Sequence, residues 1–177
     1  MNDADALDLL RAAVPAADGE VWADLGAGTG VFTRALAALV GSAGRVIAVD
    51  RDGRALETLR RSAAGGSAAV IDILVGDVTG PLGLPPLDGV VMANVLHFVA
   101  DAEGVVSRVA ALLKPGGRLV LIEYEGRRPS RWVPHPVDSA RFVELAAGAG
   151  FTPPRVVSRR PSLFGGDIYA AVAERAQ

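Results

Sequence analysis

A glycine-rich segment directly after a short apolar run limits the folds open to this chain more than any other feature. The segment reads Asp24-Leu25-Gly26-Ala27-Gly28-Thr29-Gly30, and it separates Val21-Trp22-Ala23 from an apolar-periodic stretch. This order predicts a buried strand, a tight turn and a helix. Glycine is required in such a turn where a side chain would forbid a positive φ or block a ligand from the backbone. We therefore predict a cofactor-binding turn after the first strand.

Apolar segments alternate with helix-like segments along the rest of the chain. Strands are predicted over residues 21–25, 45–49, 69–75, 89–93 and 118–124, and helices over residues 4–13, 31–40, 52–64, 101–113 and 138–149. Asp3 or Asp5 is expected to cap the first helix, Gly65-Gly66 to close the helix over 52–64, and Lys114-Pro115-Gly116-Gly117 to form a turn.

The last stretch breaks this alternation. Residues 155–158 and 168–173 are two apolar segments with no helix between them, which predicts an antiparallel pair. The fold class expected is α/β, with a Rossmann-like, doubly wound, mostly parallel seven-stranded sheet and one antiparallel strand near the C-terminus. We expect residues 1–177 to form a single domain, with a leading helix in 1–15 and a candidate substrate loop at 125–137.

Composition excludes several classes of function. The chain has no cysteine and two histidines far apart, so neither cysteine chemistry nor a metal site is expected. A net charge of -2 gives no pull toward nucleic acid, and no run reaches the roughly 20 apolar residues of a membrane span. Because the N-terminus is acidic rather than a basic signal region, the expected location is cytoplasmic.

The spacing of the glycines indicates which cofactor is bound. A dinucleotide fingerprint would place its third glycine at position 31, which is Val31, whereas here the third glycine is Gly30. The pattern acidic-x-Gly-x-Gly-x-Gly resembles motif I of the class I S-adenosylmethionine (SAM)-dependent methyltransferases, and the predicted sheet matches theirs over nearly the whole chain. The resemblance is strongest to small stand-alone members, and it implies methyl transfer to an O, N or C atom of a small molecule.

The resemblance implies a role for the acidic residue at each strand end. In this family the motif I acid, here Asp24, interacts with the amino-acid end of SAM directly or through water. Asp50 follows the second strand, where a carboxylate can accept hydrogen bonds from both ribose hydroxyls, while Asp52 is expected to cap the next helix. Asp77 resembles the family's adenine site. The cofactor-binding residues predicted are Asp24, Gly26, Ala27, Gly28, Gly30, Asp50, Arg51, Gly76, Asp77, Val78 and Asn94.

The loop after the fourth strand, Asn94-Val95-Leu96-His97, faces the methyl donor in this family. The Asn-Pro-Pro-Tyr type of sequence found in amino-directed nucleic-acid methyltransferases is absent, which disfavours that branch. His97 is the first candidate for a catalytic base, because histidine titrates near neutral pH; Tyr124, Glu123 and His135 follow. A base is not obligatory, and a structural His97 bonded to a backbone carbonyl is the alternative. The predicted acceptor wall consists of Phe98, Tyr124, Trp132, His135 and Phe164.

The sequence leaves open the role of three arginines, the oligomeric state and a non-catalytic function. Arg127, Arg128 and Arg131 form either a solvated cluster or a site for an anionic substrate. A homodimer is a hypothesis, since a second subunit could complete so small a pocket. A non-catalytic SAM-binding regulatory or scaffold module remains as a second function. A nicotinamide oxidoreductase is disfavoured by Val31 and by the lack of a Tyr-x-x-x-Lys proton relay.

Overall fold

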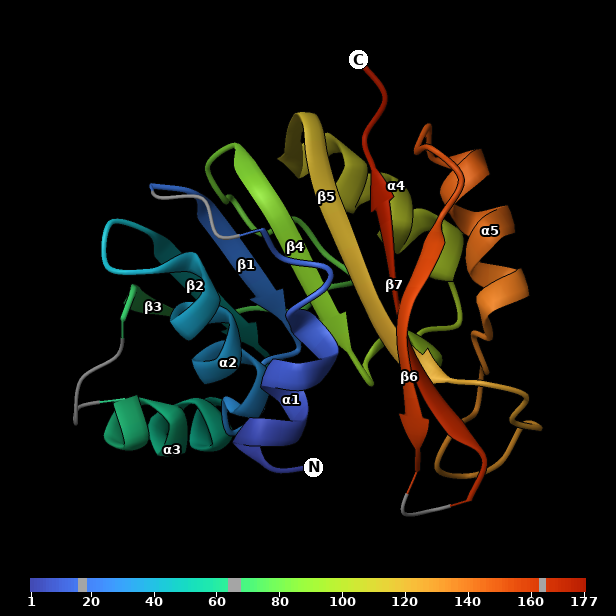
Figure 1. Cartoon of the computed structure of the whole chain (residues 1–177), viewed down its shortest axis with the longest axis horizontal. Coiled ribbons are helices and arrows are strands. Elements are labelled where there is room, and N and C mark those ends of the chain that lie inside the picture. Colours follow the sequence, from blue (N-terminus) through green and yellow to red (C-terminus); the bar gives the residue numbers. More distant parts are fainter. Residues whose placement is uncertain (16–18, 64–67, 163–164) are drawn as a thin grey trace.

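Seven strands form one mixed sheet in the computed structural model, which describes residues 1–15, 19–63, 68–162 and 165–177 (Figure 1). The strand order is β3-β2-β1-β4-β5-β7-β6, with β7 antiparallel to both of its neighbours. The bounds are β1 Val21–Leu25, β2 Arg45–Asp50, β3 Val70–Val75, β4 Leu87–Ala93, β5 Leu113–Tyr124, β6 Arg155–Pro161 and β7 Asp167–Glu174. The predicted fold class is confirmed.

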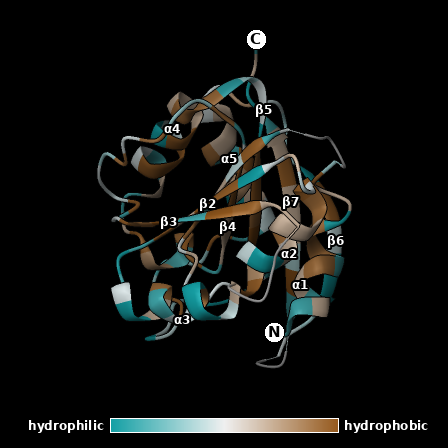
Figure 2. Cartoon of the chain, turned by 90° about the vertical axis from the view of Figure 1, so that its left-hand side faces the viewer, coloured by the Kyte–Doolittle hydropathy of each residue, from teal (hydrophilic) through white to brown (hydrophobic). Residues whose placement is uncertain are grey.

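Helices cover both faces of this sheet. Their bounds are α1 Asp3–Leu10, α2 Val31–Val40, α3 Gly53–Ala63, α4 Ala102–Leu112 and α5 Ser139–Gly148, with a short 3₁₀ turn η1 at Leu96–Phe98. The first three helices lie on one face, and α4 and α5 lie on the other (Figure 1). Figure 2 shows the strands mostly in the hydrophobic colour and the outer turns of α3 in the hydrophilic one. Central strands covered on both sides contain continuous apolar segments, such as Val90-Val91-Met92, which is completely buried.

Several element boundaries differ from those predicted. Asn2, rather than Asp3 or Asp5, caps α1: its Oδ1 accepts from the backbone N of Asp5 at 2.8 Å, and Oδ2 of Asp5 accepts from the backbone N of Asn2 at 3.2 Å. This reciprocal capping box fixes the start of the helix at Asp3, one residue earlier than predicted. The predicted stop of α3 at Gly65-Gly66 lies outside the described residues.

The expected turn at residues 114–117 is wrong, because β5 already begins at Leu113. Leu113 pairs with Leu87 of β4, and the register shifts before Gly89 pairs with Arg118. Gly116 has a φ of +76° and donates its N–H to the carbonyl of Arg175 at 3.0 Å. A long-range partner therefore draws these residues into an irregular part of the strand.

The parallel strands direct the predicted site residues to one edge of the sheet. The arrowheads of β1, β4 and β5 point to the lower edge in Figure 1, where the loops that follow them lie together. Open α/β sheets bind ligands at the carboxyl ends of their strands, next to the point where the strand order reverses. In the described part of the chain no helix is both long and apolar enough to cross a lipid bilayer.

Candidate active site

The turn between β1 and α2 depends on two glycines for different reasons. Gly26 has a φ of +86°, and a Cβ there would overlap the side chain of Val95. Gly28 has a φ of +53°, and a Cβ there would meet no atom within 4 Å. Gly26 therefore allows close packing inside the protein, whereas Gly28 leaves the backbone open for a ligand to approach.

Asp50, at the end of β2, joins this turn to the next loop. Its Oδ2 accepts from the backbone N of Gly28 at 2.8 Å, and its Oδ1 accepts from the backbone N of Asp52 at 2.8 Å. A carboxylate offers about four acceptor positions, so capacity remains for a ligand's hydroxyl groups. Asp52 itself accepts from the backbone N of Arg54 at 2.9 Å, as expected of a helix cap.

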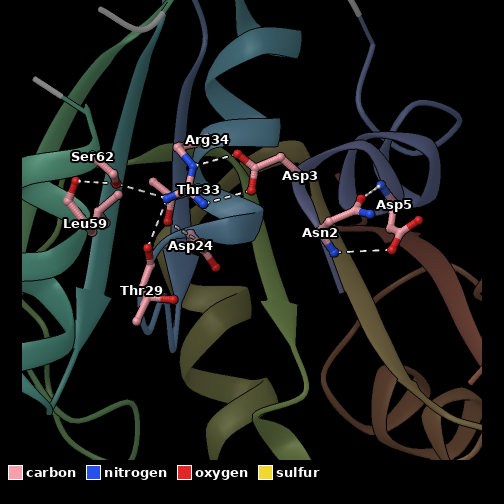
Figure 3. A network of polar contacts seen from close by, with 9 residues as sticks. All are labelled: Asn2, Asp3, Asp5, Asp24, Thr29, Thr33, Arg34, Leu59 and Ser62. Carbon is pink, nitrogen blue, oxygen red and sulfur yellow. Dashed lines mark hydrogen bonds and ion pairs between the residues drawn. The ribbon is translucent and has the colours of Figure 1, made fainter. Parts of the chain in front are cut away.

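Asp24 lies in β1, directly before the turn, and is only 1% exposed. Its Oδ2 accepts from the hydroxyl of Thr33 at 2.6 Å, a contact drawn in Figure 3. Burial raises the pKa of Asp24 to about 7; the hydrogen bond from Thr33 opposes that rise, and the charge of Asp50 adds to it. Asp24 thus joins β1 to α2, the two elements on either side of the glycine turn.

A cavity of about 260 Å³ opens at this edge of the sheet. Its lining residues are Gly26, Asp50, Arg51, Gly76, Asp77, Val78, Thr79, Asn94, Val95, Phe98 and Val99. The predicted cofactor residues Asp24, Ala27, Gly28 and Gly30 lie in the adjoining strand and turn and do not line it. Sequence reasoning missed Thr79, Val95 and Val99; only Thr79 carries a local signal, since an Asp-x-Thr sequence favours a side-chain turn.

Asp77 forms such a turn. Its Oδ1 accepts from both the backbone N and the hydroxyl of Thr79, at 2.8 Å and 2.7 Å. These two bonds, with a smaller contribution from the positive charge of Arg51, hold the pKa of Asp77 below its ordinary value. Asp77 therefore presents an ionised carboxylate whose Oδ2 makes neither contact with Thr79 and is available to accept from an amine.

A second cavity, of about 480 Å³, adjoins the first at Asn94 and Phe98, which line both. Its other lining residues are His97, Tyr124, Arg127, Ser130, Trp132 and Val133. Phe98 and Trp132 are 57% and 73% exposed, which puts them at the cavity mouth. Phe164 lies outside the described residues. His135 does not line this cavity; its backbone N instead donates to the carbonyl of His97 at 2.9 Å.

His97 forms a buried pair with Glu123, the residue before the end of β5. The exposed fractions are 2% and 1%, and Nδ1 of His97 lies 2.6 Å from Oε2 of Glu123. Oε1 of Glu123 also accepts from the backbone N of His97 at 3.2 Å. The alternative of a histidine bonded to a backbone carbonyl is therefore wrong about the partner. With the carboxylate as acceptor at Nδ1, the neutral form of the imidazole carries its proton on Nδ1 and its lone pair on Nε2.

A family model described as a methyltransferase domain matches residues 23–121, from β1 into β5. The chain belongs to this methyltransferase family. Membership in this family implies SAM as the cofactor. The first cavity, at the ends of β1, β2 and β3, is the candidate site for it.

Two curated relatives are similar in sequence, and the second of them is a methyltransferase. An uncharacterised 37.1 kDa protein in transposon TN4556 of Streptomyces fradiae is 32% identical over 82% of this chain and 47% of its own length. A demethylmenaquinone methyltransferase of Tropheryma whipplei is 34% identical over 65% of this chain and 45% of its own length. The chain thus spans about half the length of these relatives.

A solved structure described as a methyltransferase shares the fold. The protein, from Bacillus halodurans, superposes with a TM-score of 0.79 at 14% identity and covers 98% of this chain and all of its own. At that identity the likeness concerns the fold alone.

The first cavity and the glycine turn that adjoins it fit SAM in three respects. Gly28 leaves open space above the turn, and Asp50 and Asp77 retain acceptor positions for a ribose diol and an exocyclic amine. Oδ1 of Asn94 is buried and has no hydrogen-bond partner in the described structure, so it is an acceptor available to a ligand's donor. Asn94 is also held at a φ of +55°, which few residues other than glycine adopt.

Proposed function

We propose that this methyltransferase transfers a methyl group from SAM to an O, N or C atom of a small molecule, with His97 as the base that removes the acceptor's proton. The observation that carries the proposal is the buried His97–Glu123 pair, which opens on a cavity adjoining the predicted cofactor cavity. A base oriented by a carboxylate and facing a pocket is the arrangement that proton abstraction requires.

The proposal assigns the cofactor to residues at the ends of β1 to β4. Asp50 would bind the ribose hydroxyls, Asp77 and the N–H of Val78 the adenine, and Asn94 a donor near the amino-acid end. The hydrogen bonds from Gly28 and Asp52 to Asp50 support this assignment, because they fix the carboxylate before any ligand arrives. Asp24 supports the glycine turn indirectly, because its carboxylate accepts a hydrogen bond from Thr33 in the helix that follows the turn.

When bound, SAM supplies a methyl group on a sulfonium: the acceptor's electron pair takes the methyl carbon, and the electrons of the broken carbon–sulfur bond stay on sulfur. His97 accepts the acceptor's proton at Nε2, so the attacking atom gains its electron pair. Glu123 then faces an imidazolium, which its carboxylate stabilises through Nδ1. Phe98, Tyr124 and Trp132 line this cavity and would pack against the acceptor, which holds it close to the donor.

The test is formation of S-adenosylhomocysteine. The purified protein is incubated with SAM and a panel of phenolic and quinol acceptors, and S-adenosylhomocysteine and methylated product are quantified together. We expect equal amounts of both with at least one acceptor. S-adenosylhomocysteine binding without any product from the panel would contradict the proposal and favour a binding module.

Glu123→Gln is the matched variant, because it retains the size of the side chain and removes the charge that orients His97. We expect kcat to fall about 100-fold, in the range that general-base catalysis contributes. The affinity for S-adenosylhomocysteine and the acceptor KM should stay within about threefold of wild type, because Glu123 touches neither ligand in this proposal. A loss confined to thermal stability, with kcat retained, would show that the pair is only structural.

A further inference from the structure

The second cavity, where the acceptor is proposed to bind, has a positive charge beside its aromatic side chains. Arg127 lines the cavity, with its Cζ 5.1 Å from the centroid of the Tyr124 ring. Its Nη2 donates to the carbonyl of Gly165 at 2.8 Å, which holds the guanidinium in place. None of the described residues that line this cavity is an aspartate or glutamate. Arg127 is therefore the charged side chain that an acceptor meets there.

The loop that forms this wall adds further cations. Residues 125–137 contain Arg127, Arg128 and Arg131 and one acidic residue, Glu125, whose carboxylate is paired with Arg159 at 2.9 Å, although the whole chain is net negative. Cζ of Arg131 lies 5.6 Å from the centroid of the Trp132 ring, and Trp132 lines the cavity. A guanidinium stacked on a ring still presents its N–H edges outward, in the fork that matches a carboxylate.

Tyr124 connects this positive end of the cavity with the base. Its ring centroid lies 5.8 Å from that of His97, while Arg127 stands over the same ring. A flat molecule that stacks along Tyr124 can therefore place one end at His97 and the other at Arg127. The first cavity differs from this one, since Asp50 and Asp77 bring negative charge to it.

We propose that the acceptor is an aromatic hydroxy acid: a planar molecule with a hydroxyl group at His97 and a carboxylate at Arg127 and Arg131. The position of the methylated hydroxyl rests on the proposed function, whereas binding of the carboxylate does not. The inference favours the anionic-substrate interpretation for Arg127, which lines a cavity, whereas Arg128 and Arg131 are exposed.

The experiment compares two planar probes, 6-hydroxy-2-naphthoate and 6-hydroxy-2-naphthamide, in which the hydroxyl group lies at the opposite end of the ring system from the carboxylate or the neutral amide. Each is titrated calorimetrically into the protein saturated with S-adenosylhomocysteine. We expect the acid to bind at least about tenfold more tightly than the amide, since hydrogen bonds to charged groups are stronger than neutral ones. Raising the salt concentration should reduce this preference.

Three variants assign the preference to the loop. Arg127→Gln should bring the acid and the amide to within about threefold of one another, and Arg131→Gln should close part of the gap. Arg128→Gln is the matched control: Arg128 and Arg131 are both exposed and line no part of the cavity, but only Arg131 stacks on a ring that does, that of Trp132, so the preference should persist in Arg128→Gln. Circular dichroism melting curves verify that each variant is folded.

Equal affinity for the two probes, or failure of both to bind the wild-type protein, would overturn the inference. So would a preference that both Arg127→Gln and Arg131→Gln retain in full. These results are separable from failure of the proposed function. Methyl transfer to neutral phenols without an acid preference would leave the function standing, whereas an acid preference without any methyl transfer would leave the binding site standing.

Discussion

Asp50, in the proposed cofactor site, shows at the scale of one residue how the fold orients a carboxylate. Both of its oxygens accept backbone N–H groups, one from the glycine turn and one from the loop that begins α3. The carboxylate is therefore oriented without a ligand, and its remaining lone pairs point away from these donors. Asp52, two residues further on, instead caps α3, because its carboxylate accepts a hydrogen bond from the backbone N of Arg54.

We expect Asp50→Ala to lower the affinity for S-adenosylhomocysteine by about 100-fold, because it removes charge-assisted bonds to the ligand and releases the turn at Gly28. Calorimetric titration measures this change. Asp52→Ala is the control: it should cost about 1 kcal/mol of stability through the lost cap and change the affinity by less than about threefold. Wild-type affinity in Asp50→Ala would remove Asp50 from the cofactor site.

Asp24 predicts a pH dependence of stability. Its pKa, raised by burial to about 7, lies above the value of about 3.9 that an unfolded chain gives. Between these two values the folded protein holds a proton that the unfolded chain has lost. The free energy of unfolding should therefore fall as pH rises, by up to about 1.4 kcal/mol per pH unit, and level off above about pH 7.

Asp24→Asn removes the titrating group and should remove this slope. Urea unfolding at several pH values between about 4 and 8 measures it. Asp8→Asn, on the exposed side of α1, is the matched control and should keep the wild-type slope. Parallel curves for Asp24→Asn and wild type would mean that another group causes the dependence.

At the scale of elements, Arg34 of α2 links the glycine turn to α1 and α3 (Figure 3). Its Nε and Nη2 donate to the two carboxylate oxygens of Asp3 on α1, each at 2.8 Å. Its Nη1 donates to the carbonyl of Thr29 in the glycine turn at 3.0 Å and to the hydroxyl of Ser62 on α3 at 3.1 Å. The short first helix is thus tied to the turn through one side chain.

We expect Arg34→Gln to weaken S-adenosylhomocysteine binding about three- to tenfold, because the carbonyl of Thr29 loses the donor that fixes the turn. Stability should fall by only about 1 kcal/mol, since Arg34 and Asp3 are partly exposed and water screens their pairing. Arg54→Gln, at an exposed position of α3, serves as the control for loss of a positive charge. Equal affinities in both variants would show that the contact with Thr29 does not shape the turn.

Local sequence signals predict where the helices lie, to within a few residues, but they do not predict which strands contact one another. The bounds of α2 and the helix cap at Asp52 follow from periodicity and cap chemistry, and the structure confirms them. The early start of β5 depends on Leu87 and Arg175, which lie far away in sequence. His97 and Glu123 are each candidate bases from sequence, but their pairing requires β4 and β5 to lie side by side, which periodicity does not encode.

At the scale of the whole molecule, the two halves of the sheet border different cavities. The loops after β1, β2 and β3 supply most of the first cavity, and the second is built on β4, β5 and the loop at 125–137. The antiparallel strand β7 supports that loop at both ends. The backbone N of Glu125 donates to the carbonyl of Asp167 at 2.9 Å, and the hydroxyl of Tyr169 donates to the carbonyl of Val137 at 2.9 Å.

Tyr169→Phe should therefore affect the acceptor site from within the core. Tyr169 is completely buried, so the variant leaves the carbonyl of Val137 without its donor and should cost about 1–3 kcal/mol of stability. Because Val137 ends the acceptor loop, we expect weaker acceptor binding and an unchanged affinity for S-adenosylhomocysteine, both measured by titration. Val109→Ala on α4, a buried truncation expected to cost about 2 kcal/mol, controls for lost stability alone. If both variants weaken acceptor binding equally, the loop is sensitive to overall stability, and the division between the two halves of the sheet fails.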